Sequence, residues 1–217
     1  TKGRTQTLSK DFSTVTFDWA NMLPSYEGKS ATTAQKNAVA TLMYCCGIAA
    51  DMQYGGSTLN GSGAFTDVMG LGATTYFGYE ADKFITTYTK SEYGESAFEP
   101  AEYGVTTSKF EQYFNADLEA GRPIIMGGED DEAGGHEFVC DGRNTSGYFH
   151  INWGWEGADD GWFLITCFQP NPHETNYSGY RNTMVVNIYP EGWTAVESVE
   201  KEGGQFGFNP NLPVYNL

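Results

Sequence analysis

Apolar side chains in the first half of the chain recur every three to four positions, the spacing of a helix that buries one face. Residues 34–46 show this spacing after a capping threonine and before Gly47, so we expect a helix that ends at Gly47. Residues 64–77 predict a second helix, weakened by two internal glycines. Residues 108–120 place aromatic side chains and a leucine on one stripe, and they predict a third helix that Gly121 ends.

Beyond Pro123 the apolar segments become short and are bounded by glycine and other turn residues, which is typical of strands. We expect strands at residues 123–126, 136–142, 148–155, 161–165 and 183–189. Their number and spacing favour a curled antiparallel sheet, or half-barrel, on the C-terminal side. Helices that precede strands in this order predict an α+β fold.

Residues 191–217 differ from the rest because they combine prolines and glycines with little periodicity. We interpret them as a linker or tail toward a following domain, and residues 1–190 as one folded unit. A chain of 217 residues in which 15% are aromatic has enough apolar material for a substantial core.

The chain is strongly acidic, with a formal net charge of −16 at pH 7. This charge repels phosphate backbones and anionic membrane surfaces, so nucleic acid is not expected as a partner. No apolar run is long enough to cross a bilayer, and we expect no membrane span. The charge suits solubility outside the cell, and the expected location is secreted, either extracellular or on the cell surface.

Of the three histidines, His136 stands out because Gly134 and Gly135 precede it at the start of an expected strand. Small neighbours leave its ring room to face a substrate, and histidine is the usual general base near neutral pH. His150 lies inside an alternating strand and His173 in a polar loop. A single histidine is more often structural than catalytic, so both roles stay open for His136 from this pattern alone.

A second feature is the pair Trp153 and Trp155, which one glycine separates. Alternate residues of a strand share a face, so the two indoles are expected on one side. They form either an ordinary core pair or a wall that shields a catalytic imidazole from water. The spacing of histidines and cysteines matches no zinc pattern, and neither a metal nor another cofactor is expected.

Several motifs in a fixed order carry a resemblance to a known family. They lie at residues 17–24, 47–55, 134–142, 148–155 and 160–163. Together they resemble the streptopain-type family of papain-like bacterial cysteine peptidases, and its interpain-like members in particular. The match runs over roughly residues 15–190, and the ordered set is far more specific than any one motif.

The resemblance implies a papain-like fold of two lobes, with a cysteine nucleophile at a helix N-terminus on one lobe and a histidine base on the β-rich lobe. On that mapping His136 is the base, and Trp153 and Trp155 shield it. Related papain-like enzymes orient the imidazole with an asparagine. Here Trp153 takes that position, while the adjacent Asn152 is expected to point to the other face. The implied activity is hydrolysis of peptide bonds in proteins or peptides, without a cofactor.

The four cysteines include no evident nucleophile. In papain-like chains the cysteine precedes the histidine by about 130–150 residues, which places it near or before Thr1. Cys45 and Cys46 are too near His136 in sequence, and they lie at a helix C-terminus, where a thiolate is disfavoured. We therefore expect a peptidase domain that is incomplete at its N-terminus. A missing N-terminal segment would carry the nucleophile, and this chain alone would be inactive.

Two other functions fit the same residues. A peptidase-like domain without a nucleophile can serve as a non-catalytic module that binds peptides or a partner protein. An amidase or transferase can also use this scaffold, because a fold does not fix the reaction.

Overall fold

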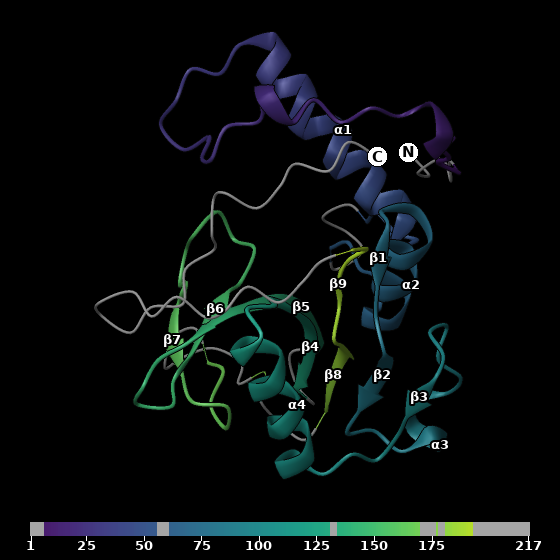
Figure 1. Cartoon of the computed structure of the whole chain (residues 1–217), viewed down its shortest axis with the longest axis vertical. Coiled ribbons are helices and arrows are strands. Elements are labelled where there is room, and N and C mark those ends of the chain that lie inside the picture. Colours follow the sequence, from purple (N-terminus) through teal and green to yellow (C-terminus); the bar gives the residue numbers. More distant parts are fainter. Residues whose placement is uncertain (1–6, 56–60, 131–133, 170–176, 178–180, 193–217) are drawn as a thin grey trace.

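The computed structural model of the chain describes residues 7–55, 61–130, 134–169, 177 and 181–192. Its helical elements are η1 (Phe12–Thr14), η2 (Trp19–Asn21), α1 (Thr33–Ala49), α2 (Thr66–Tyr76), α3 (Lys90–Tyr93) and α4 (Thr107–Glu119). Its strands are β1 (Tyr79–Glu80), β2 (Lys83–Thr86), β3 (Ala101–Glu102), β4 (Ile124–Asp130), β5 (Gly134–Arg143), β6 (Phe149–Asn152), β7 (Gly161–Phe163), β8 (Asn182–Val186) and β9 (Tyr189–Pro190). Figure 1 shows their arrangement.

Helix α1 begins as its sequence predicts and ends later than predicted. The Thr32 hydroxyl accepts the Gln35 backbone N–H, and the Gln35 side chain accepts the Thr32 N–H, which completes a capping box. The helix does not end at Gly47 but continues to Ala49. Gly47 is buried, and a Cβ there would lie 1.8 Å from the hydroxyl oxygen of Tyr54. This glycine therefore serves close packing and not helix termination.

The two glycines that weaken α2 allow it to approach its neighbours. A Cβ at Gly70 would lie 2.5 Å from a methyl carbon of Val185 in β8. A Cβ at Gly72 would lie 2.4 Å from the backbone oxygen of Ala49 in α1. The second predicted helix is confirmed, and its glycines place it tightly against both elements.

Seven strands form one sheet in the order β3-β2-β8-β4-β5-β6-β7, in which only the β2–β3 pair is parallel. The antiparallel α+β prediction is confirmed. The expected division into early helices and late strands is wrong in one respect, because β1, β2 and β3 all precede α4. Three of the four residues of β2 are buried, so this strand lacks the alternation that would have revealed it.

Three predicted strands are shorter than expected, and the one predicted at 161–165 ends at Phe163. The segment 148–155 leaves the sheet after Asn152, because the next backbone N–H groups bind side chains and not a neighbouring strand. The segment 183–189 is interrupted at Asn187, whose φ of 59° is incompatible with an extended strand. Of the expected tail at residues 191–217, only Glu191 and Gly192 fall within the described part of the chain.

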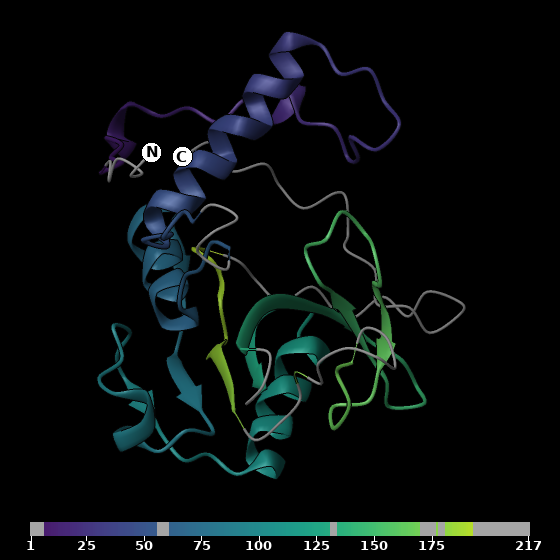
Figure 2. The ribbon, with the colours of Figure 1, turned by 180° about the vertical axis from the view of Figure 1, so that it is seen from behind.

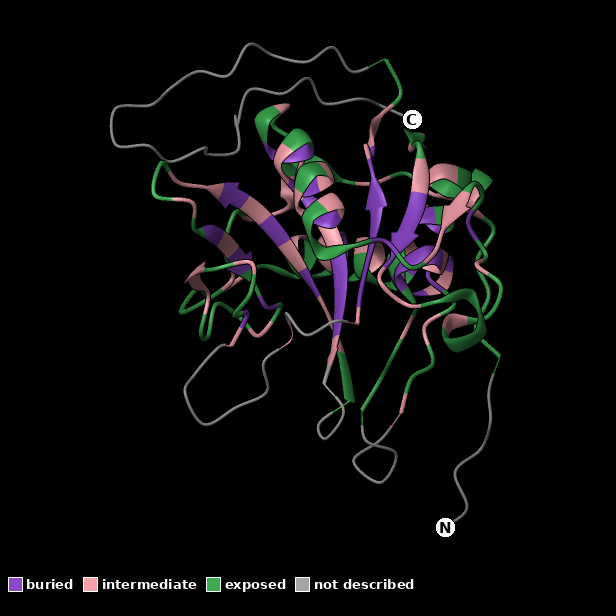
Figure 3. Cartoon of the chain, turned by 90° about the horizontal axis from the view of Figure 1, so that it is seen from below, coloured by how far each residue is buried: buried purple, intermediate pink, exposed green. Residues whose placement is uncertain are grey.

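The sheet carries a core on each face, and Figure 3 shows buried residues concentrated along its strands. Met184 faces the larger core, to which α4 contributes Phe110, Phe114 and Leu118. The next residue of β8, Val185, faces the smaller core, where Ala73 of α2 packs. Helices α4 and α2 therefore cover opposite faces of the sheet.

Helix α1 projects beyond the sheet, with the chain that contains η2 running beside it (Figures 1 and 2). Its larger apolar side chains are only partly covered, and Met43 is 66% exposed. No helix in the described ranges has the length and apolar character needed to cross a membrane.

Candidate active site

Strand β5 presents His136 near its first residues, where Gly134 and Gly135 are exposed and the strand is paired with β4. The imidazole Nε2 lies 2.8 Å from the backbone oxygen of Trp153. Because a carbonyl oxygen only accepts hydrogen bonds, Nε2 carries the proton in this contact. In the neutral ring Nδ1 is then the basic nitrogen, and no described residue hydrogen-bonds it.

Trp153 is held firmly, so its carbonyl has a fixed direction. The side chain is fully buried, and its indole N–H donates to the backbone oxygen of Asp159 at 3.1 Å. Its backbone N–H donates to the carboxylate of Asp160 at 2.9 Å. The residue in the position where related enzymes have an asparagine thus meets the imidazole through its backbone and not through a side chain.

Asn152 lies beside this contact but does not take part in it. Its side chain is exposed, and its Oδ1 accepts the backbone N–H of Gly154 at 2.9 Å. Gly154 has a φ of 76°, so the chain turns sharply directly after the strand. In this structure Asn152 shapes the turn that carries the two indoles, and it makes no hydrogen bond to His136.

Aromatic rings surround the imidazole of His136. The ring centroids of Trp155 and Tyr177 lie 4.8 Å and 5.6 Å from it, and those of Phe138 and Trp153 lie 6.1 Å and 6.2 Å away. Trp153 and Trp155 are stacked, with centroids 5.6 Å apart and planes inclined by 18°. Both predicted indoles therefore adjoin the predicted base. Tyr177 was not predicted, because its surroundings in sequence have no strand or helix pattern.

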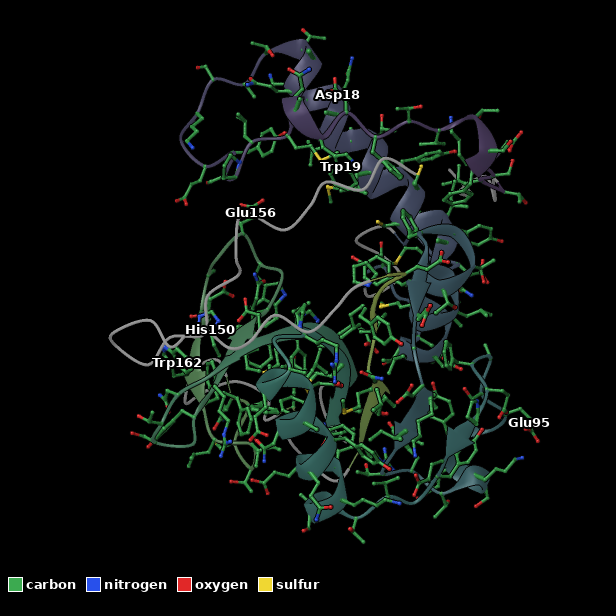
Figure 4. The ribbon with its side chains drawn as sticks, viewed as in Figure 1. Asp18, Trp19, Glu95, His150, Glu156 and Trp162 are labelled. Carbon is green, nitrogen blue, oxygen red and sulfur yellow. The ribbon has the colours of Figure 1, made fainter. Side chains whose placement is uncertain are left out.

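The other histidines lie in different surroundings. His150 projects from β6 toward Trp162 of β7, as Figure 4 shows, and its Nδ1 lies 2.6 Å from the carboxylate of Asp141. This pair is about one third exposed. His173 falls outside the described residues. Only His136 combines a backbone-bound Nε2 with an aromatic enclosure among the histidines that the structure describes.

None of the four cysteines makes a hydrogen bond to His136, and all four are free thiols. Cys45 and Cys140 are completely buried, and burial raises the pKa of the Cys140 thiol well above its usual range. Cys46 lies in the last turns of α1, where desolvation also raises its pKa. A raised pKa leaves the thiol protonated, so these positions are poor sites for a thiolate nucleophile.

The described residues contain no group of three or more His, Cys, Asp or Glu side chains that could hold a metal ion. The catalytic roles assigned from sequence to His136, Trp153, Trp155 and Asn152 stay predictions, to which the structure adds positions and contacts.

An antiparallel sheet that presents an imidazole with a fixed tautomer, enclosed by indoles, is the histidine-bearing half of a papain-like cysteine peptidase fold. The comparisons identify the family. Residues 1–163 match the model of the Peptidase C10 family. The chain belongs to this family of streptopain-type cysteine peptidases.

Named relatives agree with this assignment. Streptopain of Streptococcus pyogenes is 30% identical over 183 residues, which are 82% of this chain and 41% of that protein. The thiol protease/hemagglutinin PrtT of Porphyromonas gingivalis is 32% identical over 103 residues, which are 46% of this chain and 11% of that protein. The chain thus spans less than half the length of the curated relatives that it matches.

Solved structures give the same result. Active interpain A, a cysteine protease of Prevotella intermedia, superposes with a TM-score of 0.62 at 35% identity, covering 79% of this chain and 64% of that one. A prointerpain A fragment with a cysteine-to-alanine mutation gives a TM-score of 0.58 at 37% identity, covering 81% of this chain and 49% of that one. The papain-like fold is therefore established for this chain.

Proposed function

We propose that this chain supplies the general base of a streptopain-type cysteine endopeptidase, with His136 as that base. The observation that carries the proposal is the hydrogen bond from His136 Nε2 to the Trp153 carbonyl, because it leaves Nδ1 as the basic nitrogen. Family membership supplies the reaction class, which is hydrolysis of peptide bonds in proteins or peptides by a cysteine nucleophile.

The reaction follows from this tautomer. Nδ1 of His136 takes the proton of the cysteine thiol, and the resulting thiolate attacks the peptide carbonyl carbon. The imidazolium then donates that proton to the departing amine as the C–N bond breaks, which leaves an acyl-enzyme. A water molecule gives its proton to Nδ1 and attacks the thioester, and the thiol is restored when the carboxylic acid product leaves.

The nucleophile is proposed to lie outside these 217 residues. The support is the environment of the four cysteines that the chain does contain. Cys45 and Cys140 are inaccessible, and Cys46 has a raised pKa. Cys167 is exposed, but it follows His136 in sequence, whereas the nucleophile of papain-like chains precedes the histidine. A second support is α1, which leaves Met43 and Tyr44 exposed on a helix that projects beyond the sheet. We propose that the nucleophile-bearing segment covers this helix and that this chain alone is inactive.

The indoles are proposed to act through the imidazole and not on the substrate. Trp153 holds the Nε2 proton, and Trp155 lies against the ring at 4.8 Å. Excluding water from one side of the ring strengthens its attraction to a nearby thiolate, because the local dielectric constant is lower. We expect Trp155→Ala to lower kcat more than it changes KM.

The test compares the whole gene product with the 217-residue chain. Each is given an unstructured protein substrate and is also treated with a peptide-based electrophile that alkylates an active-site thiol. We expect the whole gene product to hydrolyse the substrate and to be labelled, and the 217-residue chain to do neither. In the whole product, His136→Ala should lower kcat/KM by at least about 1,000-fold.

The matched control is His150→Ala, which removes a histidine of the same sheet whose ring binds Asp141. It should retain most of the activity. An active His136→Ala variant would contradict the assignment of the base, and hydrolysis by the isolated chain would contradict the position of the nucleophile. Peptide binding without hydrolysis by the whole product would favour the non-catalytic module instead.

We also propose that the protein is secreted. The support is the net charge of −16, which suits a protein dissolved outside the cell. Immunodetection in culture medium, cell-wall and cytoplasmic fractions tests this proposal, and recovery from the cytoplasm alone would contradict it.

A further inference from the structure

The residue after His136, Glu137, lies in a row of three paired residues across the central strands β5, β4 and β8. Gly127 of β4 is paired with Glu137 of β5 on one side and with Thr183 of β8 on the other. Because directly paired residues share a face of the sheet, the side chains of Glu137 and Thr183 both stand beside the bare backbone of Gly127. A Cβ at Gly127 would lie 2.5 Å from a carboxyl oxygen of Glu137 and 2.6 Å from the Thr183 hydroxyl.

Helix α2 covers the space above Gly127, between the side chains of Glu137 and Thr183. Its first residue, Thr66, is 1% exposed, and its hydroxyl lies 2.9 Å and 2.7 Å from the two carboxyl oxygens of Glu137. The same hydroxyl lies 2.6 Å from that of Thr183, which is 7% exposed. The Glu137 carboxyl is therefore bound by a helix residue 71 positions away in sequence, and the hydroxyl of that residue also contacts β8 through Thr183.

His136 and Glu137 point to opposite faces of β5. Phe138, which shares the face of His136, belongs to the core that α4 covers. Glu137 points to the face of the sheet that α2 covers. Consecutive residues of β5 therefore contact the aromatic rings around the imidazole on one face and helix α2 on the other. The proposed mechanism requires the ring of His136 to keep its position, and Glu137 is the next residue along the strand.

We propose that Glu137 is a positioning residue for His136, which fixes its strand through Thr66 and Thr183 and supports the imidazolium with its charge when ionised. The inference rests on the proposed role of His136 as the base. Glu137 does not contact substrate or the reacting atoms in this role.

The electrostatic surroundings of Glu137 make its charge dependent on pH. Burial raises its pKa to about 7, with the Thr66 hydrogen bond opposing this and the nearby Asp67 adding to it. Asp67 is 4% exposed and accepts hydrogen bonds from the backbone N–H of Val68 and Ala97 and from the Tyr93 hydroxyl. Tyr93 also interacts electrostatically with Glu137, and burial together with Asp67 raises its pKa above the accessible range.

The consequence for catalysis has a definite sign. Above pH 7 the ionised Glu137 places a negative charge one residue from the imidazole, and this charge favours the thiolate–imidazolium pair over the neutral pair. The thiolate–imidazolium pair then persists to higher pH, so the alkaline limb of kcat/KM lies higher than it would without the carboxylate. Because the two side chains lie on opposite faces of the strand, we expect a shift of about 0.5 pH unit.

The first measurement needs no nucleophile. Histidine Cε1–H signals of the chain are recorded by NMR at pH 6 and pH 8 in wild type, Glu137→Gln and Thr66→Val, with His150 as the internal reference. We expect Glu137→Gln to move the His136 signal at pH 8, where the wild-type carboxyl is ionised, and to leave the His150 signal unchanged. An unchanged His136 signal at pH 8 in folded Glu137→Gln would overturn the electrostatic part of the proposal.

The second measurement uses the whole gene product and separates positioning from folding. Thr66→Val removes the hydrogen bond to the carboxyl, whereas Thr66→Ser keeps it, so we expect kcat to fall about tenfold in the first variant and to recover in the second. If kcat and the alkaline limb are the same in folded Thr66→Val, Thr66→Ser and wild type, positioning is refuted.

The inference and the proposed function fail separately. If His136→Ala keeps activity, the base is wrongly assigned, whatever the Glu137 variants do to the His136 signal. If His136→Ala is inactive while the Glu137→Gln signals and the Thr66→Val kinetics both match wild type, only the role of Glu137 is wrong.

Discussion

The buried carboxyl of Glu137 predicts an unusual dependence of stability on pH. Its pKa is about 7 in the folded chain, against an ordinary value of 4.5. Between these values the folded chain keeps a proton that the unfolded chain has released. The free energy of unfolding must therefore fall as pH rises through this window, opposite to the behaviour of a carboxylate in a salt bridge.

The magnitude follows from the two pKa values. Each unit of difference corresponds to about 1.4 kcal/mol, so the full window of 2.5 units gives at most about 3.5 kcal/mol. Glu137→Gln cannot ionise and should be free of this loss. Relative to wild type, its free energy of unfolding should rise by about 2–3 kcal/mol between pH 4.5 and pH 7.5.

Urea unfolding, followed by tryptophan fluorescence at several pH values, measures this difference directly. The matched control is Glu27→Gln, which removes an exposed carboxyl and changes the net charge equally. Subtracting the control removes the effect of net charge on the whole molecule. A difference between Glu137→Gln and wild type that is the same at pH 4.5 and pH 7.5 would refute the reasoning.

Two further substitutions test the packing. The Asp117 carboxylate is 2% exposed and accepts a hydrogen bond from the Arg122 guanidinium at 2.7 Å. Arg122→Met leaves this buried carboxylate without its cation, and we expect the free energy of unfolding in urea to fall by about 3–5 kcal/mol. The double variant with Asp117→Asn should lose less, and an equal loss would contradict the ion-pair argument. Gly72→Ala should cost about 1–3 kcal/mol because α2 must move from α1, whereas Gly63→Ala, with open space around it, should cost little. Equal thermal midpoints for these two glycine variants would show that the helix contact is not tight.

The sequence predicted those elements whose signals are local. The Thr32 cap and the aromatic stripe of α4 each lie within one helix, and both helices were found. Strand β2 was missed because Phe84, Ile85 and Thr86 are all buried, which removes the alternation of apolar and polar residues. The predicted end of α1 at Gly47 was wrong, because the sequence does not distinguish a glycine that ends a helix from one that makes room for Tyr54.

For the site, the sequence predicted which residues lie together but not how they interact. His136 and both indoles come from motifs within one stretch of chain, the structure brings their rings side by side, and their catalytic roles stay predictions. The acceptor for the imidazole was missed because a search of side chains does not reveal a backbone oxygen. The environment of Glu137 was missed because its partner Thr66 is 71 positions away and only folding joins them.

A backbone oxygen as the acceptor at residue 153 limits how substitutions can change this contact. Every amino acid carries a carbonyl, so no substitution at position 153 can delete the oxygen that accepts the imidazole N–H. A substitution elsewhere that leaves His136 in place can alter this contact by redirecting the main chain, for example at the turn that Asn152 and Gly154 form. In the laboratory, an ester bond in place of the amide between Trp153 and Gly154 would make the Trp153 carbonyl a poorer hydrogen-bond acceptor. This change alters the contact with His136 without changing any side chain.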